Sequence, residues 1–419
     1  MIQIDETTRN LLLNNSVNRE IILRFPDDDF EITGSNIVSE SFELTQSICD
    51  DKEFHLGGGV AGKMEVQTIG VDTELSGKRV NVFLRATYSN SRLVPSQTLV
   101  PSQSLIIGEQ RQSVEIQLFS GKIYSAKRQK NRSIKKLVAY DLMYELSKLT
   151  IPLDVLTSYV TRRSASNPHG VILISDFITD MANLYFDDYI ITIDLTNSFD
   201  LDENRALLNR AVSLPLNNDC ITGAAKKGVN VLKLLQAYAE LNASCVFYKA
   251  NGDLRFCSLV ECQSYNSNAV KKAVVEVIPS YKNLSFDEFT VEPIQYMRFK
   301  YADKSIVYAG SSKSQSCYLS DNILTRFCAN TGSFFDNIKR RNFFLGSNYC
   351  YQPYKAEVFS RWWLEPGDRV QIKTGYTDVE TIDTFVFSRT IKGVNGMKVT
   401  IEAKGVERLG EKEGEERNG

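Results

Sequence analysis

The sequence predicts a mainly β protein with α+β insertions, in which two antiparallel β-barrel domains flank a mixed helical and α+β middle region. Three observations carry this prediction. Short segments near both ends alternate apolar and polar residues with a period of two, as half-buried strands do. Segments in the middle repeat apolar residues every three or four positions, as amphipathic helices do. A turn-and-strand pattern also occurs once near each end of the chain.

Residues 1–145 are predicted to form the first barrel. Turn residues such as those at 26–29 and 57–59 separate its strand signals, and several short strands with such turns are typical of an antiparallel barrel or sandwich. The strand signals are REIILRF, SFELTQSI, KMEVQTIGV, RVNVFL and VEIQLF.

A Pro- and Ser-rich insert, residues 85–111, interrupts this first domain. It contains the tandem hexamers LVPSQT and LVPSQS. Because prolines remove hydrogen-bond donors from a strand ladder, the insert is predicted to be a loop. Two interpretations stay open for it: a contact arm for a neighbouring subunit, or a disordered excursion.

Residues 146–285 form the predicted mixed α/β middle region. The segment LISDFITDMANLYFDDY carries an apolar stripe at helical spacing, and GVNVLKLLQAYAELNAS carries a second one. Stripes of this kind are typical of helices packed on a core. The Asn251–Gly252 pair between two β-rich runs then predicts a hairpin turn.

Residues 286–408 are predicted to form the second barrel, and residues 409–419 a disordered charged tail. Asn395–Gly396 predicts a second hairpin turn, and the tail has no large apolar residue after Leu409 to bury. The strand signals are IQYMRFKYA, SIVYAG, DRVQIKT, DTFVFSRTI and KVTIEAKG.

The two predicted barrels share a pattern that indicates an internal duplication. The spacing from Gly77 to Ser125 is 48 positions and that from Gly367 to Ser388 is 21, and the difference of 27 equals the length of the insert. Three such chains around an axis would present six quasi-equivalent barrels, which suits a trimer docked on a six-fold ring. The matched segments are GKRV, IYSAK and KLVAY in the first copy, and GDRV, VFSR and KVTIE in the second.

The composition is that of an ordinary globular protein of 419 residues. Its 49 basic residues nearly balance 51 acidic ones, which favours neither nucleic-acid recognition nor an anionic membrane surface. The first residues lack the parts of a secretory leader, and no apolar run approaches the ~20 residues that span a bilayer. The eight cysteines are irregularly spaced without a CxxC pair, which indicates free thiols.

The sequence predicts no catalytic site and no cofactor site. The two histidines, His55 and His169, lie outside any nucleophile or zinc motif and are interpreted as turn or surface residues. Residues 57–59, a glycine triplet, lack the Gly-Lys-Ser/Thr of a phosphate-binding loop and lead into a strand.

No metal site is expected either. The acidic clusters at 27–29, 50–51 and 187–188 occupy turn-like or helix-end positions. The first of them does not continue into the spacing of a calcium loop. Paired carboxylates of a glycosidase would have to face each other across a cleft, and nothing in the spacing of these residues indicates that.

Two further segments are candidates for contacts with other molecules. Neighbouring side chains of a strand face opposite ways, so one of Trp362 and Trp363 is expected in the core and the other at the surface. The exposed Trp, beside Arg361, would anchor a protein interface or stack on a sugar. The basic stretch 127–136 falls at a predicted hairpin turn, and is interpreted as a solvated turn or an inter-subunit or tube contact.

Four blocks of the sequence, taken in order, resemble the baseplate hub proteins of phage tails. The family shares a Tal-like N-terminal region and occurs in tailed phages, prophages and phage tail-like contractile particles. Together the blocks cover most of residues 20–405. They are SESFELTQSICDDKEFHLGGGVAGKMEVQTIGV, GKIYSAKRQKNRSIKKLVAYDLMYELSKL, TGAAKKGVNVLKLLQAYAELNASCVFYKANGDLRFCSL and LEPGDRVQIKT.

The resemblance implies a homotrimer at the tip of a tail tube, with two tube-like β-barrels per chain. Its implied partners are the tail tube or distal tail protein ring, and a spike, fibre or tape-measure protein. The implied location is the virion tail tip or the baseplate of a tail-like particle, after synthesis in the bacterial cytoplasm. Many members continue into a peptidase, lysozyme or fibre region, which this chain is not expected to contain.

The sequence therefore predicts a structural hub that adapts a six-fold tube to a three-fold spike or fibre, without a cofactor. Two alternatives stay open. One is a cell-wall hydrolase, and the other is a glycan-binding adhesin of the tail tip that uses Trp362 or Trp363. Whether the tail contracts, which host it serves and which protein caps the trimer are not determined by the residues.

Overall fold

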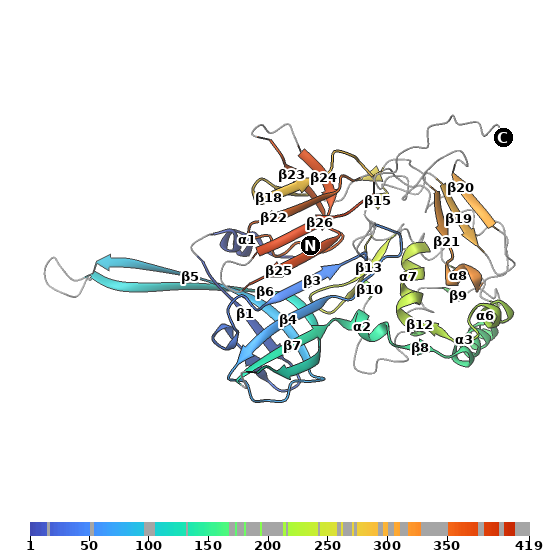
Figure 1. Ribbon diagram of the computed structural model, residues 1–419, viewed down its shortest axis with the longest axis horizontal. Coiled ribbons are helices and arrows are strands. Elements are labelled where there is room, and N and C mark those ends of the chain that lie inside the picture. The colour runs from blue at the N-terminus through green and yellow to red at the C-terminus, as the bar shows by residue number, and fades with distance from the viewer. Residues whose placement is uncertain are drawn as a thin grey trace.

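A computed structural model shows a β-rich body with a helical region on one side (Figure 1). It describes residues 1–14, 17–50, 54–95, 105–130, 133–166, 172–173, 180–181, 193–194, 213–214, 217–241, 244–257, 261–262, 270–271, 275–291, 296–300, 306–310, 317–327, 351–375, 381–393 and 398–406. His169, the 187–188 cluster and the 409–419 tail lie outside these ranges.

The N-terminal module consists of seven strands between residues 18 and 140. Along β4 the buried residues Met64, Val66 and Thr68 alternate with more exposed ones, which confirms the period-two prediction for KMEVQTI. The strands lie in the order β3-β4-β7-β6-β5-β1-β2. They are β1 (Asn18–Phe25), β2 (Phe30–Ile32), β3 (Glu43–Ser47), β4 (Lys63–Ile69), β5 (Arg79–Pro95), β6 (Leu105–Arg128) and β7 (Ile134–Tyr140), with a 3-10 turn η1 (Gly34–Asn36) after β2.

The C-terminal module also consists of seven strands. Two of them, β17 (Val275–Ile278) and β18 (Tyr281–Phe286), pair with strands from the end of the chain. The module therefore begins about ten residues earlier than the predicted boundary at residue 286. Its other strands are β22 (Tyr354–Val358), β23 (Arg369–Lys373), β24 (Thr381–Phe385), β25 (Ser388–Lys392) and β26 (Lys398–Ala403).

Both modules contribute to one 11-stranded sheet. Its order is β18-β22-β26-β25-β3-β4-β7-β6-β5-β1-β2. Among the described residues no sheet closes on itself, so the protein is mainly β as predicted but the two predicted barrels are not found as closed barrels. An isolated bridge between Ile37 and Thr68 links the segment after β2 to β4.

The middle region combines helices with short strands. Val231, Leu234, Leu235 and Tyr238 of α7 are buried, as the predicted stripe requires. The Asn251–Gly252 hairpin is confirmed, because β13 and β14 pair on either side of it. The helices are α2 (Leu142–Leu146), α3 (Leu153–Ser166), α6 (Asn218–Ala224), α7 (Val231–Leu241) and α8 (Ile323–Arg326).

The short strands of this region form several small sheets. Three of them, β19 to β21, were predicted as part of the second barrel but pair only with one another. The strands are β8 (Thr150–Ile151), β9 (Ile172–Leu173), β10 (Ile193–Asp194), β11 (Ser213–Leu214), β12 (Val229–Asn230), β13 (Cys245–Tyr248), β14 (Leu254–Cys257), β15 (Glu261–Cys262), β16 (Val270–Lys271), β19 (Tyr296–Lys300), β20 (Ile306–Gly310) and β21 (Cys317–Ser320).

The first predicted middle helix, LISDFITDMANLYFDDY, falls almost wholly outside the described residues. Of its stripe only Met181 is described, and it is fully buried. None of the helices in the ranges given above is long and apolar enough to cross a bilayer.

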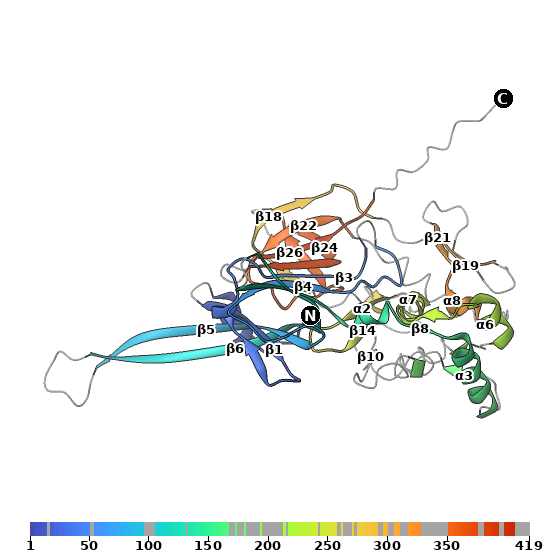
Figure 2. The ribbon, with the colours of Figure 1, turned by 60° about the horizontal axis from the view of Figure 1, so that its bottom comes forward.

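The insert 85–111 is mostly strand, which corrects the loop prediction. β5 and β6 pair continuously from Arg79–Lys122 to Pro95–Leu105, and the part beyond Tyr88 projects from the body as a long two-stranded arm (Figures 1 and 2). Pro95 is tolerated because it is the last residue of its strand, where a missing donor costs little. Residues 96–104, which include the second hexamer, are outside the described ranges.

Candidate assembly interface

The two modules are joined within the chain by an antiparallel strand pair. Ser388–Lys392 of β25 pairs with Glu43–Ser47 of β3, with Thr390 directly opposite Thr45. At one end of the pair the Ser47 hydroxyl donates to the Phe387 carbonyl at 3.2 Å, and at the other Lys392 forms an ion pair with Glu43 at 3.0 Å. The sheet of one module thus continues into the sheet of the other.

A buried arginine reinforces this junction. Arg389 is 0% exposed, and its guanidinium donates to Gln46 Oε1 at 3.1 Å, to the Trp362 carbonyl at 2.8 Å and to the Leu364 carbonyl. Burial lowers the pKa of Arg389 to about 10, while Glu365 and Asp368 favour its charged form. A signal for the burial of Arg389 is present in the sequence, because in the alternating strand SRTIK it lies on the same inward face as Ile391.

An aromatic pair fills the end of the same junction. Phe54, from the connection between β3 and β4, stacks on Phe387 with ring centroids 5.0 Å apart. Tyr351 meets the same ring edge-on at 4.7 Å. Stacked and edge-on pairs of this kind stabilise a contact beyond the area they bury.

The repeated sequence pattern has the same backbone geometry in both modules. Gly77 N donates to the Ile123 carbonyl at 2.8 Å, and Ile123 N donates to the Lys78 carbonyl at 2.8 Å. Gly367 and Val386 make the equivalent first bond at 2.7 Å, and Val386 N returns one to the Asp368 carbonyl at 2.7 Å. Both glycines have positive φ, +81° and +90°, which an L side chain adopts only with strain.

The strand order around this pattern also matches. In the first module the strands lie in the order β3-β4-β7-β6-β5-β1. In the second module β18, β22 and β26 take the places of β3, β4 and β7, and β25 and β24 together take the place of β6. Strands β23 and β17 take the places of β5 and β1. The outermost pairs differ, because β1 runs antiparallel to β5 whereas β17 runs parallel to β23.

The last strand pairs in a register that differs from the alignment by sequence. Ser125 lies opposite Val138, and Ser388 lies opposite Glu402. By strand pairing, Val138 therefore corresponds to Glu402. The sequence match aligns Val138 with Thr400 instead, which lies two residues before Glu402. A bulge next to Ser125 in β6 separates Tyr124 from the ladder, and Phe387 occupies the same place in the second module.

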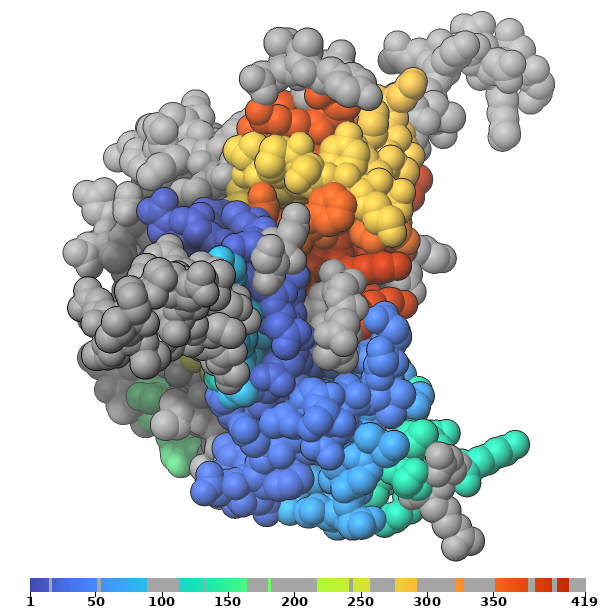
Figure 3. All heavy atoms as spheres, turned by 90° about the vertical axis from the view of Figure 1, so that its left-hand side faces the viewer, coloured from blue at the N-terminus to red at the C-terminus, as the bar shows by residue number. Residues whose placement is uncertain are grey.

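Among the strand edges of the described chain that have no strand beside them, two, one in each module, correspond to the two strands of the β25–β3 pair. The first is the outer edge of Tyr124–Arg128 in β6, which pairs with β7 on its other side and extends past the end of β5. The second is the outer edge of β18, the terminal strand of the 11-stranded sheet. Figure 3 shows the segment 275–291, yellow, at one end of the molecular face and the teal β6 region at the other.

The tryptophan prediction is wrong. Trp362 and Trp363 lie in a turn and not in a strand, and both are 1% exposed. Helix α1 (Glu6–Leu13), capped by Asp5, brings Arg9 over the Trp363 ring at 5.2 Å, and Arg19 lies over Trp362 at 4.8 Å. Neither ring is available to a sugar or to another protein.

The other predicted residues take structural positions. His55 is exposed, as expected of a turn histidine. A Cβ at Gly57 would lie 2.6 Å from the Gln236 carbonyl, and one at Gly59 would lie 2.3 Å from Val246, so the glycine triplet lets its connection approach α7 and β13. The described residues contain no cluster of His, Cys, Asp and Glu with the geometry of a metal site.

The acidic cluster 27–29 and the basic stretch 127–136 both lie at the surface of the N-terminal module. Asp27 accepts from Arg79 at 3.0 Å and Asp28 from Lys78 at 2.8 Å, which ties the β1–β2 turn to the start of β5. The stretch 127–136 forms the predicted hairpin between β6 and β7, apart from residues 131–132, which are not described. Cys49, Cys220 and Cys245 are free thiols, as predicted.

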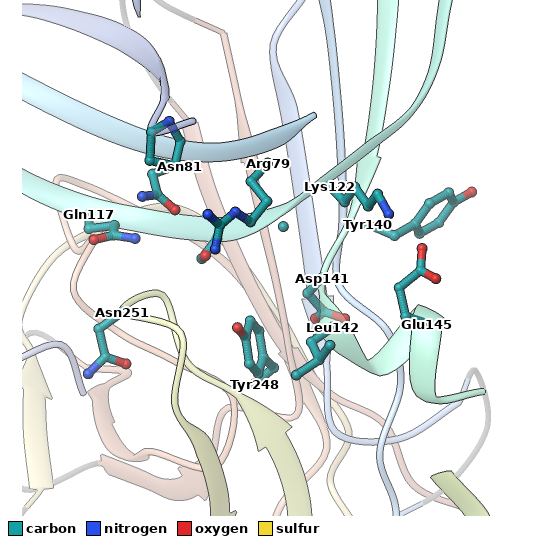
Figure 4. Close-up of a pocket in the computed structure, with 13 residues that line it drawn as sticks. Arg79, Asn81, Gln117, Lys122, Tyr140, Asp141, Leu142, Glu145, Tyr248 and Asn251 are labelled. Carbon is teal, nitrogen blue, oxygen red and sulfur yellow. The ribbon is translucent and has the colours of Figure 1, made fainter. Parts of the chain in front are cut away.

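A cavity of about 290 Å³ lies between the N-terminal module and the β13–β14 hairpin (Figure 4). Arg79 and Asn81 line one side and Tyr248 and Asn251 the other. Asp141, at its floor, is fully buried; it caps α2 and accepts from Gly62 N at 2.6 Å and Met143 N at 3.0 Å. Burial raises the pKa of Asp141 to about 8.

A tyrosine cluster stands beside this cavity. Tyr140 and Tyr144 stack with centroids 4.2 Å apart, and Tyr124 meets Tyr144 edge-on at 5.0 Å. Lys148 Nζ lies 3.7 Å from the centre of the Tyr124 ring, and its hydrogen bond lowers the pKa of Tyr124. Tyr124 is 49% exposed, so the cluster ends in an open aromatic face next to the free edge of β6.

Comparison with known proteins finds similar solved structures but no match by sequence. The sequence matches no protein-family model and none of the curated proteins. The structure is similar to a tail protein from Neisseria meningitidis, with 10% identity, a TM-score of 0.48, and coverage of 92% of this chain and 96% of that one.

Two prophage tail proteins give comparable values. The MuSo2 tail protein from Shewanella oneidensis has 11% identity and a TM-score of 0.47, covering 92% of this chain and 98% of that one. The tail protein gp18 from Listeria monocytogenes has 11% identity and a TM-score of 0.44, covering 93% and 95%.

Proposed function

We propose that this chain is a structural component of a phage tail or tail-like particle, and that three copies form a ring at the tip of the tail tube. One observation carries the proposal. Two modules with the same strand order, and the same pair of hydrogen bonds at Gly77 and Gly367, are joined edge to edge by the β25–β3 pair. A chain built in this way presents nearly the same surface twice.

Three copies would then imitate six-fold symmetry. A closed ring of three chains contains six similar modules, so one face can meet a six-fold tube while the ring itself remains three-fold for a spike or fibre. The arm of β5 and β6 projects from the body (Figure 2), and in such a ring it would contact a neighbouring ring or subunit. The resemblance of the four sequence blocks to tail hubs supports the same assignment.

The chemistry of the described residues supports an assembly role. Arg389, Gln46 and Asp141 are buried and hydrogen-bonded within the fold. Burial of both tryptophans argues against the glycan-binding alternative that relied on them. A hydrolase would need a base and a nucleophile or metal in one cleft, and His55 lies exposed in a turn.

The oligomeric mass in solution tests this proposal. Light scattering coupled to size exclusion is expected to give three times the mass of one chain at micromolar concentration. Averaged top views by electron microscopy are expected to show a ring with six similar lobes. A stable monomer or dimer across that concentration range would overturn the hub assignment. Release of murein fragments by the purified protein would instead favour a cell-wall hydrolase.

A further inference from the structure

We propose that the outer edge of β6, residues 124–128, binds the end of β18 and the residues 287–289 that follow it in a second copy of this chain, as an added antiparallel strand. This inference rests on the proposed trimer and specifies which residues meet. Unpaired strand edges expose rows of N–H and C=O groups, and pairing with another chain satisfies them. The junction already formed inside one chain is the template for this contact.

That template is the β25–β3 pair. β25 carries β26 on one side and β3 on the other, with Arg389 opposite Gln46, Thr390 opposite Thr45 and Lys392 opposite Glu43. The segment of β6 that corresponds to β25 carries β7 on one side only. The second module ends in β18, the counterpart of β3, which carries β22 on one side only. Each copy therefore offers both halves of a second junction of the same kind, one on each module.

The first half of the register comes from β6. The shared hydrogen-bond pattern equates Ile123 with Val386. Counting forward along both strands makes Ser125 the counterpart of Ser388. Lys127 is then the counterpart of Thr390, the residue that lies opposite Thr45 in the template.

The second half of the register comes from β18. Glu65 pairs with Val138 of β7, and Lys355 pairs with Glu402 of β26. Because Val138 and Glu402 are counterparts, Glu65 and Lys355 are counterparts as well. Their partners on the outer strand are Glu43 and Ser285. Counting two residues further makes Asp287 the counterpart of Thr45, and Asp287 N continues the ladder by donating to the Pro353 carbonyl at 3.1 Å.

The charges on the two edges are complementary in this register. The basic end of β6 meets the acidic residues that follow β18, and all of these charged side chains are exposed. An opposite-charge pair directly across a ladder stabilises it, whereas like charges destabilise it. The template contains the same kind of pair, Lys392 with Glu43. The cross-strand pairs between copies are Ala126–Glu288, Lys127–Asp287, Arg128–Phe286 and Ser125–Phe289.

Exposed aromatic side chains stand at the same two edges. Tyr124 is 49% exposed beside one edge, and Phe286 is 46% exposed on the other. The counterpart of Tyr124 is Phe387, which the junction inside the chain buries to 1% exposure beneath Phe54. Pairing of the edges would cover Tyr124 and Phe286 in the same way.

The two edges lie at opposite ends of the molecular face (Figure 3), so the contact is head to tail. A copy that accepts a β18 edge on its own β6 still has its β18 edge free for the next copy. Heterologous contacts of this kind close into a ring when the rotation per copy fits, and a rotation of one third of a turn gives the trimer.

Disulfide cross-linking tests the register. Directly opposite residues of an antiparallel pair have Cα atoms about 4.5–5.5 Å apart, within reach of a disulfide. Two double variants are used: Lys127→Cys with Asp287→Cys, and Ala126→Cys with Glu288→Cys. Between them they cover the hydrogen-bonded and the non-hydrogen-bonded pairs that alternate along an antiparallel ladder. We expect at least one to form covalent dimers and trimers on a non-reducing gel under mild oxidation.

Controls separate the register from chance contact. Each single cysteine variant is expected to remain monomeric on the gel. The double variant Lys127→Cys with Asn283→Cys places the second thiol four residues away, about 13 Å along the strand, and is expected to give no product. A product from this variant at the level of the designed pairs would overturn the register.

Charge reversal gives a second, independent readout. Lys127→Glu alone and Asp287→Lys alone are each expected to raise the dissociation constant of the trimer several-fold, and the double reversal to restore it. If the wild-type protein is trimeric but neither cysteine pair cross-links and the double reversal fails to rescue, this edge contact is overturned while the hub proposal stands. A wild-type protein that is monomeric overturns both.

Discussion

Arg389 and Gln46 form a buried polar pair 343 positions apart in the chain. Arg389 donates to Gln46 and to backbone carbonyls next to Trp362 and Leu364, which fixes the turn at 362–364 against the module junction. A buried guanidinium is tolerated only when its donors are paired and acidic groups lie close, and Glu365 and Asp368 supply that charge.

Replacement of Arg389 by Met is therefore expected to be costly. The carbonyl acceptors and the buried carboxylates of Glu365 and Asp368 would lose a compensating charge. Breaking one side of such a buried network typically costs about 3–5 kcal/mol. Chemical denaturation should show the free energy of unfolding reduced by that order. Lys355→Met, at an exposed position of β22, is the matched control, with an expected change within about 0.5 kcal/mol. Equal effects of the two changes would contradict the assigned role.

Asp141 predicts a pH dependence of stability. Its pKa in the folded protein is raised to about 8 from 3.8, so the folded state holds a proton that the unfolded chain releases. The contribution of Asp141 to stability is therefore full below about pH 4 and is lost as pH rises towards 8, at about 1.4 kcal/mol per pH unit within that window.

The variant Asp141→Asn isolates this effect, because Asn keeps a capping oxygen for α2 and does not titrate. The difference in unfolding free energy, wild type minus variant, is expected to fall steadily between pH 4 and pH 8. Denaturation series at several pH values measure it. A difference that stays constant with pH would show that the carboxyl is ionised throughout, held by its bonds from Gly62 and Met143.

At the scale of elements, two glycine turns start corresponding strands of the two modules. Gly77 and Gly367 hold φ values of +81° and +90°. Gly77→Ala and Gly367→Ala are each expected to lower the unfolding free energy by about 1–2 kcal/mol, since an L residue is strained there. Gly223→Ala, in helix α6 with open space around its Cα, is the control and is expected to be neutral or stabilising. Differing costs at Gly77 and Gly367 would argue against equivalent turns.

The projecting arm makes a different prediction. Beyond Tyr88 its strands pair with each other and with no other strand of the described chain. Replacing residues 90–110 with Asn-Gly, which suits a two-residue hairpin, is expected to leave the melting temperature within a few degrees of the wild type. Calorimetry measures this. Light scattering on the same variant distinguishes a contact arm, whose removal weakens assembly, from an excursion without a role.

At the scale of the whole molecule, the charges at the proposed joint predict a dependence on salt. Exposed ion pairs are screened over about 10 Å at 0.1 M ionic strength and about 3 Å at 1 M. The trimer is therefore expected to dissociate at a higher protein concentration in 0.5 M than in 0.05 M sodium chloride. Sedimentation velocity over a dilution series measures the shift. An assembly that tightens with salt would indicate an apolar joint instead.

Much of the strand content follows from local sequence. Runs such as KMEVQTI and KVTIEA alternate with a period of two, and the structure confirms them as β4 and β26. Other elements gave no such signal. β18, YKNLSF, has an irregular pattern because it is an edge strand with one face uncovered, and its place beside β22 depends on residues some 70 positions away.

The candidate interface was predictable only in part. The basic segment at 127–136 and the duplicated pattern were visible in the sequence, and both border the proposed joint. The prediction that one tryptophan is exposed was wrong, because it assumed a strand with a period of two. Trp362 and Trp363 lie instead in a turn that α1 and Arg9 cover. The loop prediction for the arm was wrong as well, because a proline at the end of a strand leaves the hydrogen bonds of the preceding residues intact.

The sequence by itself determined many of the strands, the α7 helix, the Asn251–Gly252 hairpin and the pattern shared by the two modules, because alternation, helical spacing and glycine turns act over a few residues. The tertiary structure decided that β25 pairs with β3, that Arg389 is buried and that the outer edges of β18 and of residues 124–128 in β6 have no strand beside them. Those features join segments hundreds of positions apart, and hydrogen bonding between strand edges is the same for any sequence, so only the placement of the modules selects the partner.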